Sequence, residues 1–100
     1  MEAHRKPLTM LLLTQEQCGF CEQAKEMLAR LAVEYPLAIT TLDVRSPEGQ
    51  ALALQGAILF PPGIFFDNEP FSYGRPSERK LRHEIERRLK EKTHGPPTLE

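Results

Sequence analysis

Apolar and polar positions along the chain repeat with the periods of strands and helices. Residues 8–13 form a continuous apolar run, which is typical of a central strand covered on both faces. Residues 37–44 alternate between two faces and predict a second strand. Residues 64–66 follow a proline pair, and after a turn residues 71–73 are again apolar or aromatic, which predicts a hairpin of strands three and four.

Three other segments have the apolar period of a helix. The first begins at Gly19 and ends before Pro36, because the residue preceding a proline disfavours helical backbone. Ser46-Pro47 predicts the start of a short second helix that ends at Gly56, and Ser77 predicts the start of a third. The apolar stripes consist of Phe20, Ala24, Met27, Leu28, Leu31 and Ala32 in the first helix and of Leu81, Ile85 and Leu89 in the third.

The predicted order βαβαββα describes an α/β protein with a four-stranded mixed sheet flanked by three helices. Strands one and two are joined through a helix, so they are expected to be parallel with a right-handed crossover. A chain of 100 residues is near the usual size of one domain. We expect a single domain over residues 1–92 and a disordered tail over residues 93–100, which hold a Gly-Pro-Pro sequence.

Composition narrows the range of partners. The net charge is −1, which gives no reason to expect a nucleic acid partner, and no apolar stretch is long enough to span a membrane. Lys and Arg outnumber Glu by eight to four in residues 75–94, whereas acids outnumber bases by nine to five before them. The basic third helix is interpreted first as a solvated face and second as a surface for an acidic partner. We expect a cytoplasmic protein, because the first apolar run is needed as a strand and lacks a signal-peptide cleavage site. We also expect a monomer.

The chemistry of the chain centres on Cys18-Gly19-Phe20-Cys21, which holds its only two cysteines. Two intervening residues place the sulfur atoms one helical turn apart, within reach of a disulfide. A lone C-x-x-C is compatible with half a zinc site or with a redox pair. Its place between an apolar strand and a helix start favours redox chemistry. The three histidines are scattered without paired spacing, so we expect no metal site.

The two cysteines are predicted to have different roles because they lie at different positions in the predicted helix. Cys18 lies at the helix N-terminus, where free N–H groups stabilise a thiolate, so we predict a pKa below the ordinary value of about 8.5 and a nucleophilic role. Cys21 lies a turn deeper and suits the resolving role. Gly19 allows close approach of a partner backbone, and Phe20 is interpreted either as a contact for the substrate or as core packing. Asp43 is interpreted as a strand-end cap or, less favoured, as a proton acceptor for the buried cysteine.

With these motifs the chain resembles the thioredoxin superfamily, and most closely a small glutaredoxin-like protein, over about residues 8–92. The resemblance implies a cis-proline beside the cysteine pair, for which Pro62 fits best and Pro61 is the rival. It also implies that the cis-proline and Gly74, before the last helix, shape the substrate groove. The resemblance and the motif together define the expected site: Cys18 and Cys21 as catalytic residues, and Gly19, Phe20, Pro61, Pro62, Gly74 and Arg75 as substrate-binding residues.

Three departures from the glutaredoxin pattern weaken the expected binding of glutathione. Residues 15–17 hold no lysine, Pro61 has no N–H to offer a thiol substrate, and the usual glycine pair is reduced to Gly74-Arg75. Arg75 remains available for a carboxylate. We therefore expect no resident cofactor, with glutathione a weak co-substrate at most.

The leading hypothesis is a thiol–disulfide oxidoreductase acting on protein or mixed disulfides, with glutathione or a thioredoxin reductase as electron donor. One alternative is a protein that shares an iron–sulfur cluster between two subunits through Cys18 and an external thiol. The other is a non-catalytic adaptor with a thioredoxin fold, whose last helix binds a partner through Arg79, Arg82 and Arg87.

Overall fold

The computed structural model describes the backbone of residues 6–94 and the side chains of residues 6–91. The expected order of elements is confirmed. The elements are β1 (Leu8–Thr14), α1 (Gly19–Glu34), β2 (Leu37–Asp43), α2 (Pro47–Gln55), β3 (Gly63–Phe66), β4 (Glu69–Tyr73) and α3 (Glu78–His94).

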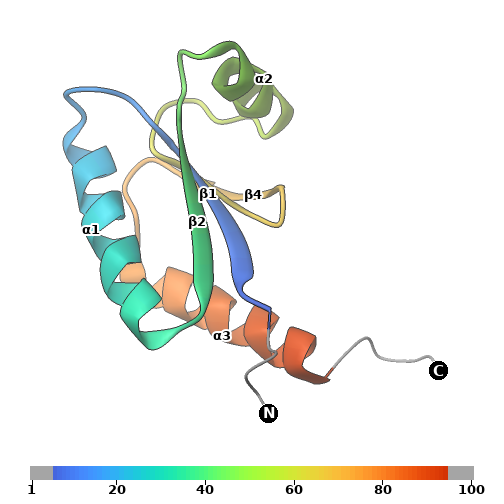
Figure 1. Ribbon diagram of the computed structural model, residues 1–100. Coiled ribbons are helices and arrows are strands. Elements are labelled where there is room, and N and C mark those ends of the chain that lie inside the picture. Colours follow the sequence, from blue (N-terminus) through green and yellow to red (C-terminus); the bar gives the residue numbers. More distant parts are fainter. Residues whose placement is uncertain (1–5, 95–100) are drawn as a thin grey trace.

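The four strands form one mixed sheet in the order β2-β1-β3-β4 (Figure 1). β1 pairs with β2 in parallel and with β3 in antiparallel orientation, so β1 is central. A two-residue turn at Asp67 and Asn68, both at positive φ, joins β3 to β4. The sheet therefore matches the predicted parallel pair and hairpin.

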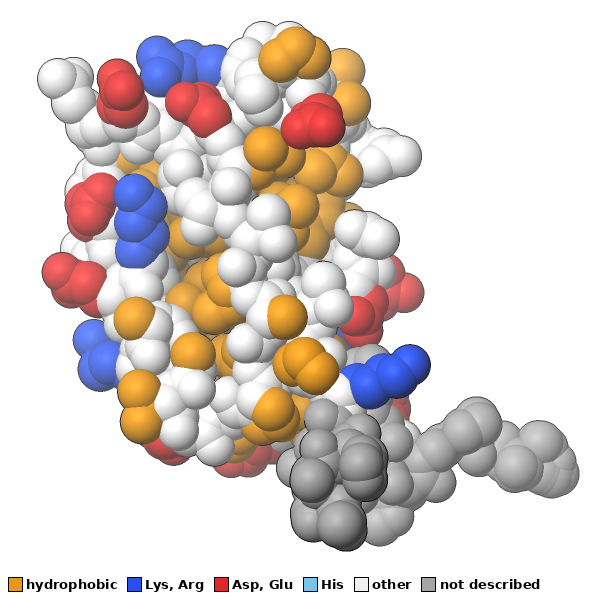
Figure 2. Space-filling model, viewed as in Figure 1, with side chains coloured by type: hydrophobic (Ala, Val, Ile, Leu, Met, Phe, Trp, Pro, Cys, Tyr) orange, Lys and Arg blue, Asp and Glu red, His pale blue; other side chains and the backbone are white. Residues whose placement is uncertain are grey.

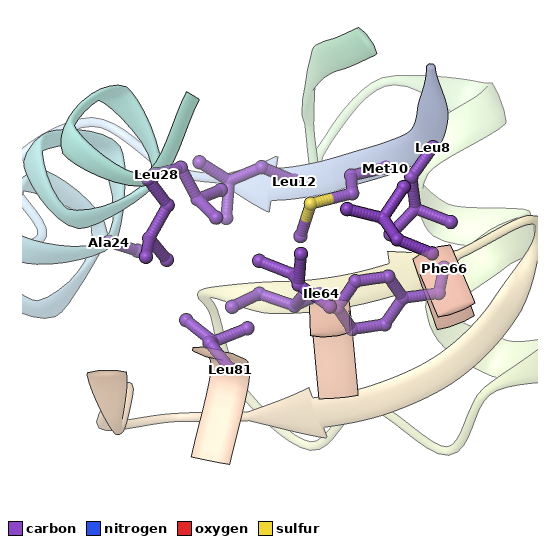
Figure 3. Close-up of a cluster of buried hydrophobic side chains, with 11 residues drawn as sticks. Leu8, Met10, Leu12, Ala24, Leu28, Ile64, Phe66 and Leu81 are labelled. Atoms are coloured by element: carbon purple, nitrogen blue, oxygen red, sulfur yellow. The ribbon is translucent and has the colours of Figure 1, made fainter. Parts of the chain in front are cut away.

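The main core lies between the sheet and the helix pair α1 and α3. Alternate β1 residues Leu8, Met10 and Leu12 point to this side and meet Ile64 and Phe66 of β3 (Figure 3). Leu13 is also fully buried but faces the opposite side, because neighbouring strand residues point to opposite faces. On that second face Leu11 is half-buried and Thr9 is exposed, so β1 is covered on both sides only toward its C-terminal end, where its apolar residues are continuous. The helices contribute Ala24, Leu28 and Leu31 from α1 and Leu81, Ile85 and Leu89 from α3.

Of the described elements, one helix, the short α2, lies on the opposite side of the sheet (Figure 1). Phe65 is buried there, and a Cβ atom at Gly56 would lie 3.2 Å from its ring. Below α2, hydrophobic side chains gather over the middle of the molecule while charged ones lie mainly toward its outline (Figure 2). This face is therefore less completely covered than the face under α1 and α3.

Several details differ from the sequence predictions. Phe20 and Ala32 are exposed and do not belong to the core stripe of α1, because they lie at its margins. The last helix includes Thr93 and His94, which we had placed in the tail. The predicted disorder of the remaining tail concerns residues 95–100, which lie outside the described residues.

The start of α2 is built on the end of β2. Ser46 is the N-cap, as predicted: its Oγ accepts a hydrogen bond from the Gly49 N–H at 2.9 Å and donates one to the Asp43 carbonyl at 2.7 Å. Gly49 is buried so close to β2 that an added Cβ would lie 2.1 Å from the same carbonyl oxygen. A glycine inside this helix is therefore required by the close approach of two backbones.

Ion pairs join the outer surfaces of α1 and α3. Arg82 binds Glu34 of α1 and Glu78 of its own helix, and Arg30 of α1 binds Glu78 at 2.7 Å. The Tyr35 hydroxyl donates a hydrogen bond to Glu86. The hydrogen bond from Arg82 holds the pKa of Glu34 below its usual 4.5, and those from Arg30 and Arg82 do the same for Glu78. These contacts link the two helices on the side away from the sheet.

This network predicts a loss of stability in acid. A carboxyl pKa that is lower in the folded than in the unfolded chain stabilises the fold above the unfolded pKa, and the contribution is lost as pH falls through the folded pKa. Thermal unfolding should show a smaller decrease in midpoint between pH 7 and pH 3 for Arg82→Gln than for the wild type. Arg79→Gln removes an exposed charge of the same helix without an ion pair and should keep the wild-type decrease. An unchanged acid dependence in Arg82→Gln would contradict the role of the network.

Candidate active site

Cys18 begins the first helix and forms a disulfide with Cys21. Cys18 is the N-cap of α1, with extended backbone (φ −123°, ψ 108°), and its Sγ accepts a hydrogen bond from the Cys21 N–H at 3.2 Å. The two Cα atoms lie 5.2 Å apart, within the usual range for a disulfide. The Cys21 N–H of the first turn is therefore directed at the sulfur on which a thiolate would form after reduction.

The two sulfur-bearing side chains differ in access to solvent. Cys18 is half-buried, whereas Cys21 is fully buried. Gly19 between them is exposed, and a Cβ added there would meet no atom within 4 Å. Phe20 is 41% exposed, which favours its interpretation as a contact surface over core packing. Within this motif, a partner molecule can therefore reach Cys18, Gly19 and Phe20 but not Cys21.

A proline loop lies against Cys18 from the other side of the site. The peptide bond between Pro61 and Pro62 is cis, so the prediction for Pro62 is confirmed and the rival Pro61 is not the cis residue. The Cys18 Sγ lies 4.0 Å from the Pro61 carbonyl oxygen. The Gly74 N–H donates a hydrogen bond to the Pro62 carbonyl at 2.8 Å, which anchors the loop to the end of β4. Segments 43 residues apart thus meet at the disulfide.

An aromatic pair flanks the proline loop and was not among the predicted site residues. Phe60 and Tyr73 make an edge-to-face contact with ring centroids 5.2 Å apart, and they are 52% and 39% exposed. Gly74 has φ +80°, and an added Cβ would lie 2.7 Å from the Phe60 ring. Tyr73 lies in the predicted fourth strand, as expected, but its ring is at the surface. In the sequence, the one signal for Phe60 as a site residue is its position directly before the proline pair.

The charged groups near the motif are engaged with one another. Asp43 accepts hydrogen bonds from the Arg45 backbone N–H at 2.7 Å and from its guanidinium, which lower the pKa of this carboxyl. Asp43 is thus a strand-end cap, as favoured from the sequence. Arg45 also lies 3.7 Å from Glu16, whose negative charge, two residues before Cys18, opposes a thiolate there. Arg45 therefore reduces the effect of that opposing charge.

The other predicted residues line the end of the sheet near the disulfide. Gly74 is buried under Phe60, and Arg75 follows it as an exposed side chain before the N-terminus of α3. In the described part of the chain, no group of three or more His, Cys, Asp or Glu side chains is placed to hold a metal ion. No helix among residues 6–94 is long and apolar enough to cross a membrane.

A central strand that leads into a C-x-x-C disulfide at a helix N-terminus, with a cis-proline against it, defines a protein of the thioredoxin superfamily. Residues 9–86 match the model of the glutaredoxin-like domain (DUF836), and the chain belongs to this family.

Known proteins with similar sequence or structure are thioredoxins and their relatives. A probable thioredoxin from Archaeoglobus fulgidus is 31% identical over 81 residues, which cover 81% of this chain and 88% of the relative. A mutant thioredoxin from Halobacterium salinarum is 26% identical, with a TM-score of 0.62 over 82% of this chain and 74% of its own. An uncharacterized thioredoxin-like protein from Clostridium perfringens has a TM-score of 0.69 at 18% identity, over 97% and 83% of the two chains. The last similarity concerns the fold alone.

Proposed function

We propose that this protein is a thiol–disulfide oxidoreductase that reduces disulfides of protein substrates. The observation that carries the proposal is the Cys18–Cys21 disulfide at the start of α1, with one accessible and one buried sulfur. Thiol–disulfide exchange requires an accessible thiolate for attack and a second thiol close behind it. The family membership and the thioredoxin-like relative support the same class of chemistry.

The reaction begins with both cysteines reduced. The Cys18 thiolate attacks one sulfur of the substrate disulfide, forms a mixed disulfide and releases the other substrate sulfur as a thiolate, which takes up a proton. Cys21 then loses its proton and attacks the Cys18 sulfur. This second exchange releases the remaining substrate thiol and forms the Cys18–Cys21 disulfide. Two electrons pass to the substrate, and the pair must then be reduced by a donor.

Local geometry assigns the first attack to Cys18. Its sulfur already accepts the Cys21 N–H and lies at the positive end of the α1 dipole, so the thiolate is stabilised after reduction. Cys21 is buried in the core, so it cannot attack a substrate disulfide directly. It reacts only after the substrate sulfur has been joined to Cys18. Cys21 lies within disulfide distance of the Cys18 sulfur, so it is placed for the resolving attack.

The surroundings of Cys18 supply a contact surface for a substrate chain. Phe20 lies on one side, and Phe60, Pro61 and Tyr73 lie on the other. Phe20, Phe60 and Tyr73 are exposed, and Phe60, which contacts Tyr73, adjoins the half-buried Pro61, whose carbonyl lies against the sulfur. These exposed rings favour a polypeptide substrate over a small polar disulfide. Pro61 offers its carbonyl but no N–H, so a substrate backbone cannot take a hydrogen bond from that position.

For the electron donor we propose a protein dithiol or a thioredoxin reductase rather than glutathione. Residues 15–17 carry no cationic side chain, and Glu16 adds a negative charge near the site. Glutathione is an anion, and the only charge that this segment carries is that of Glu16, which Arg45 partly offsets, so the segment offers it no attraction. Arg75, which follows Gly74 and is exposed, is the cation that remains to attract glutathione.

A single-turnover experiment tests the activity without any assumption about the donor. The protein is reduced with dithiothreitol, freed of reductant and mixed with an excess of a peptide that contains one disulfide. We expect one peptide disulfide to be reduced for each protein molecule, with the protein recovered as the Cys18–Cys21 disulfide by mass spectrometry. Recovery of reduced protein and intact peptide would refute the proposed activity. Recycling with NADPH and thioredoxin reductase, compared with recycling by glutathione, then tests the donor.

A further inference from the structure

The basic residues of α3 divide into paired and unpaired groups. Arg82 binds Glu34 and Glu78, and Arg87 binds Glu84 and Glu91. These two arginines, which we had considered as partner-binding residues, are therefore occupied within the chain. Arg88 is likewise bound by Asp67, Glu69 and Glu84. Among the described side chains, the cations near the start of α3 that make no ion pair are Arg75, Arg79 and Lys80.

These three cations gather along β4, the outermost strand of the sheet. Arg79, Lys80 and His83 line a hollow of about 380 Å³ beside Phe71. Arg75 and Lys80 line a second hollow of about 290 Å³, which also touches Phe71 and extends to Tyr73. We call the two together the basic groove. Its one acidic lining residue is Glu84, which Arg87 and Arg88 hold at 2.7 and 2.6 Å.

The basic groove begins close to the redox centre. Tyr73 lines the groove and contacts Phe60, the residue before Pro61, whose carbonyl lies 4.0 Å from the Cys18 Sγ. Arg75 follows Gly74, which is hydrogen-bonded to Pro62. On the other side of β4, an apolar hollow of about 650 Å³ also reaches Tyr73 and is bordered by Leu59. A chain whose disulfide is at Cys18 can therefore extend past Tyr73 and lie beside the free cations.

The edge strand itself favours recognition through side chains. Within residues 6–94, β4 pairs only with β3, so no described strand covers its outer edge. Pro70 within it has no N–H and is exposed, which prevents regular hydrogen bonding of an added strand at that residue. A partner at this edge must then be held by charge and apolar contact. Unpaired cations complement carboxylates, and like charges on a partner would be repelled.

We propose that the basic groove binds an acidic segment that flanks the target disulfide in the protein substrate. This inference rests on the proposed reductase function and adds a substrate class to it. Phe71 and Tyr73 provide the apolar floor and end of the groove, while Arg75, Arg79 and Lys80 pair with Asp or Glu side chains of the partner. The contact is made at the rim of the complex, so it affects the rate of association and its salt dependence.

The test compares two disulfide peptides of equal length as substrates of the reduced full-length protein. One carries four Asp or Glu residues after the disulfide, and the other carries Asn and Gln at the same positions. For the wild type we expect a larger second-order rate constant of single-turnover reduction with the acidic peptide and a decrease of that advantage at high salt. The double variant Arg79→Glu/Lys80→Glu should lose about tenfold in this rate constant with the acidic peptide and retain its value with the neutral one.

A matched control separates the groove from the overall charge. Lys6→Glu/Lys90→Glu changes the net charge by the same amount at exposed lysines outside the two hollows. It should leave the preference for the acidic peptide intact. An equal loss in both double variants, or the absence of any preference in the wild type, would overturn the groove while the reductase function stands. Failure of the wild type to reduce either peptide would overturn the reductase function itself. The neutral-peptide rate shows that Arg79→Glu/Lys80→Glu is folded, and Arg79→Gln/Lys80→Gln, with a smaller expected loss, provides the milder second variant.

Discussion

Cys21→Ser should convert the protein into a trap for its substrates. The Cys18 thiolate still attacks, but serine cannot carry out the second exchange, so the mixed disulfide with the substrate accumulates. We expect turnover to fall by at least about a hundredfold because the resolving step then depends on external thiols. Non-reducing gels and mass spectrometry of the protein after incubation with a disulfide peptide would detect the adduct.

The matched variant Cys18→Ser separates the roles of the two sulfurs. It retains Cys21, which is fully buried, and should form no adduct and show no reductase activity. Adducts of equal yield in both variants would show that the attacking thiol is not determined by burial. Alkylation of the reduced wild type at different pH values would test the predicted pKa of Cys18, which should lie below about 8.5. In that titration Cys21 should react only after unfolding.

Gly49→Ala should destabilise the fold strongly, although alanine is the better helix former. Helix propensity alone would stabilise the variant by about 1 kcal/mol. The added Cβ, however, would lie 2.1 Å from the Asp43 carbonyl oxygen, a backbone atom at the end of β2 that cannot move alone. Overpacking typically costs about 1–3 kcal/mol, and contact with backbone belongs at the upper end or beyond. We expect a net loss of about 2 kcal/mol, or a thermal midpoint roughly 10 °C lower.

Gly19→Ala provides the control for this substitution. It also replaces a glycine near a helix start, but a Cβ there would meet nothing within 4 Å. Its thermal midpoint should equal or exceed that of the wild type, because alanine reduces the conformational entropy of the unfolded chain. Equal midpoints for Gly49→Ala and wild type would mean that α2 can shift away from β2 without cost. The Ser46 cap, which binds the Gly49 N–H, would then have to move with it.

Local patterns in the sequence determined the elements and the identity of the redox pair. The apolar run of β1 reflects burial on both sides of its C-terminal part, and Ser46 and Ser77 each accept a hydrogen bond from the first turn of the helix they precede. The spacing of Cys18 and Cys21 places their Cα atoms within disulfide range. Such features depend on residues a few positions apart, so strand period, helix period and capping chemistry are sufficient to predict them.

Only the tertiary structure decided which distant groups meet. It placed Pro61 against Cys18, set Phe60 over Gly74, and separated the paired Arg82 and Arg87 from the unpaired cations of the basic groove. Sequence patterning counts all basic residues of α3 as equivalent, whereas pairing depends on which acids of α1 and the hairpin are brought alongside. Contacts across 40 or more residues arise from the packing of whole elements. The redox pair and part of the expected substrate surface were therefore predicted from the sequence, whereas the aromatic pair Phe60 and Tyr73 and the division of the α3 cations into paired and unpaired groups were not.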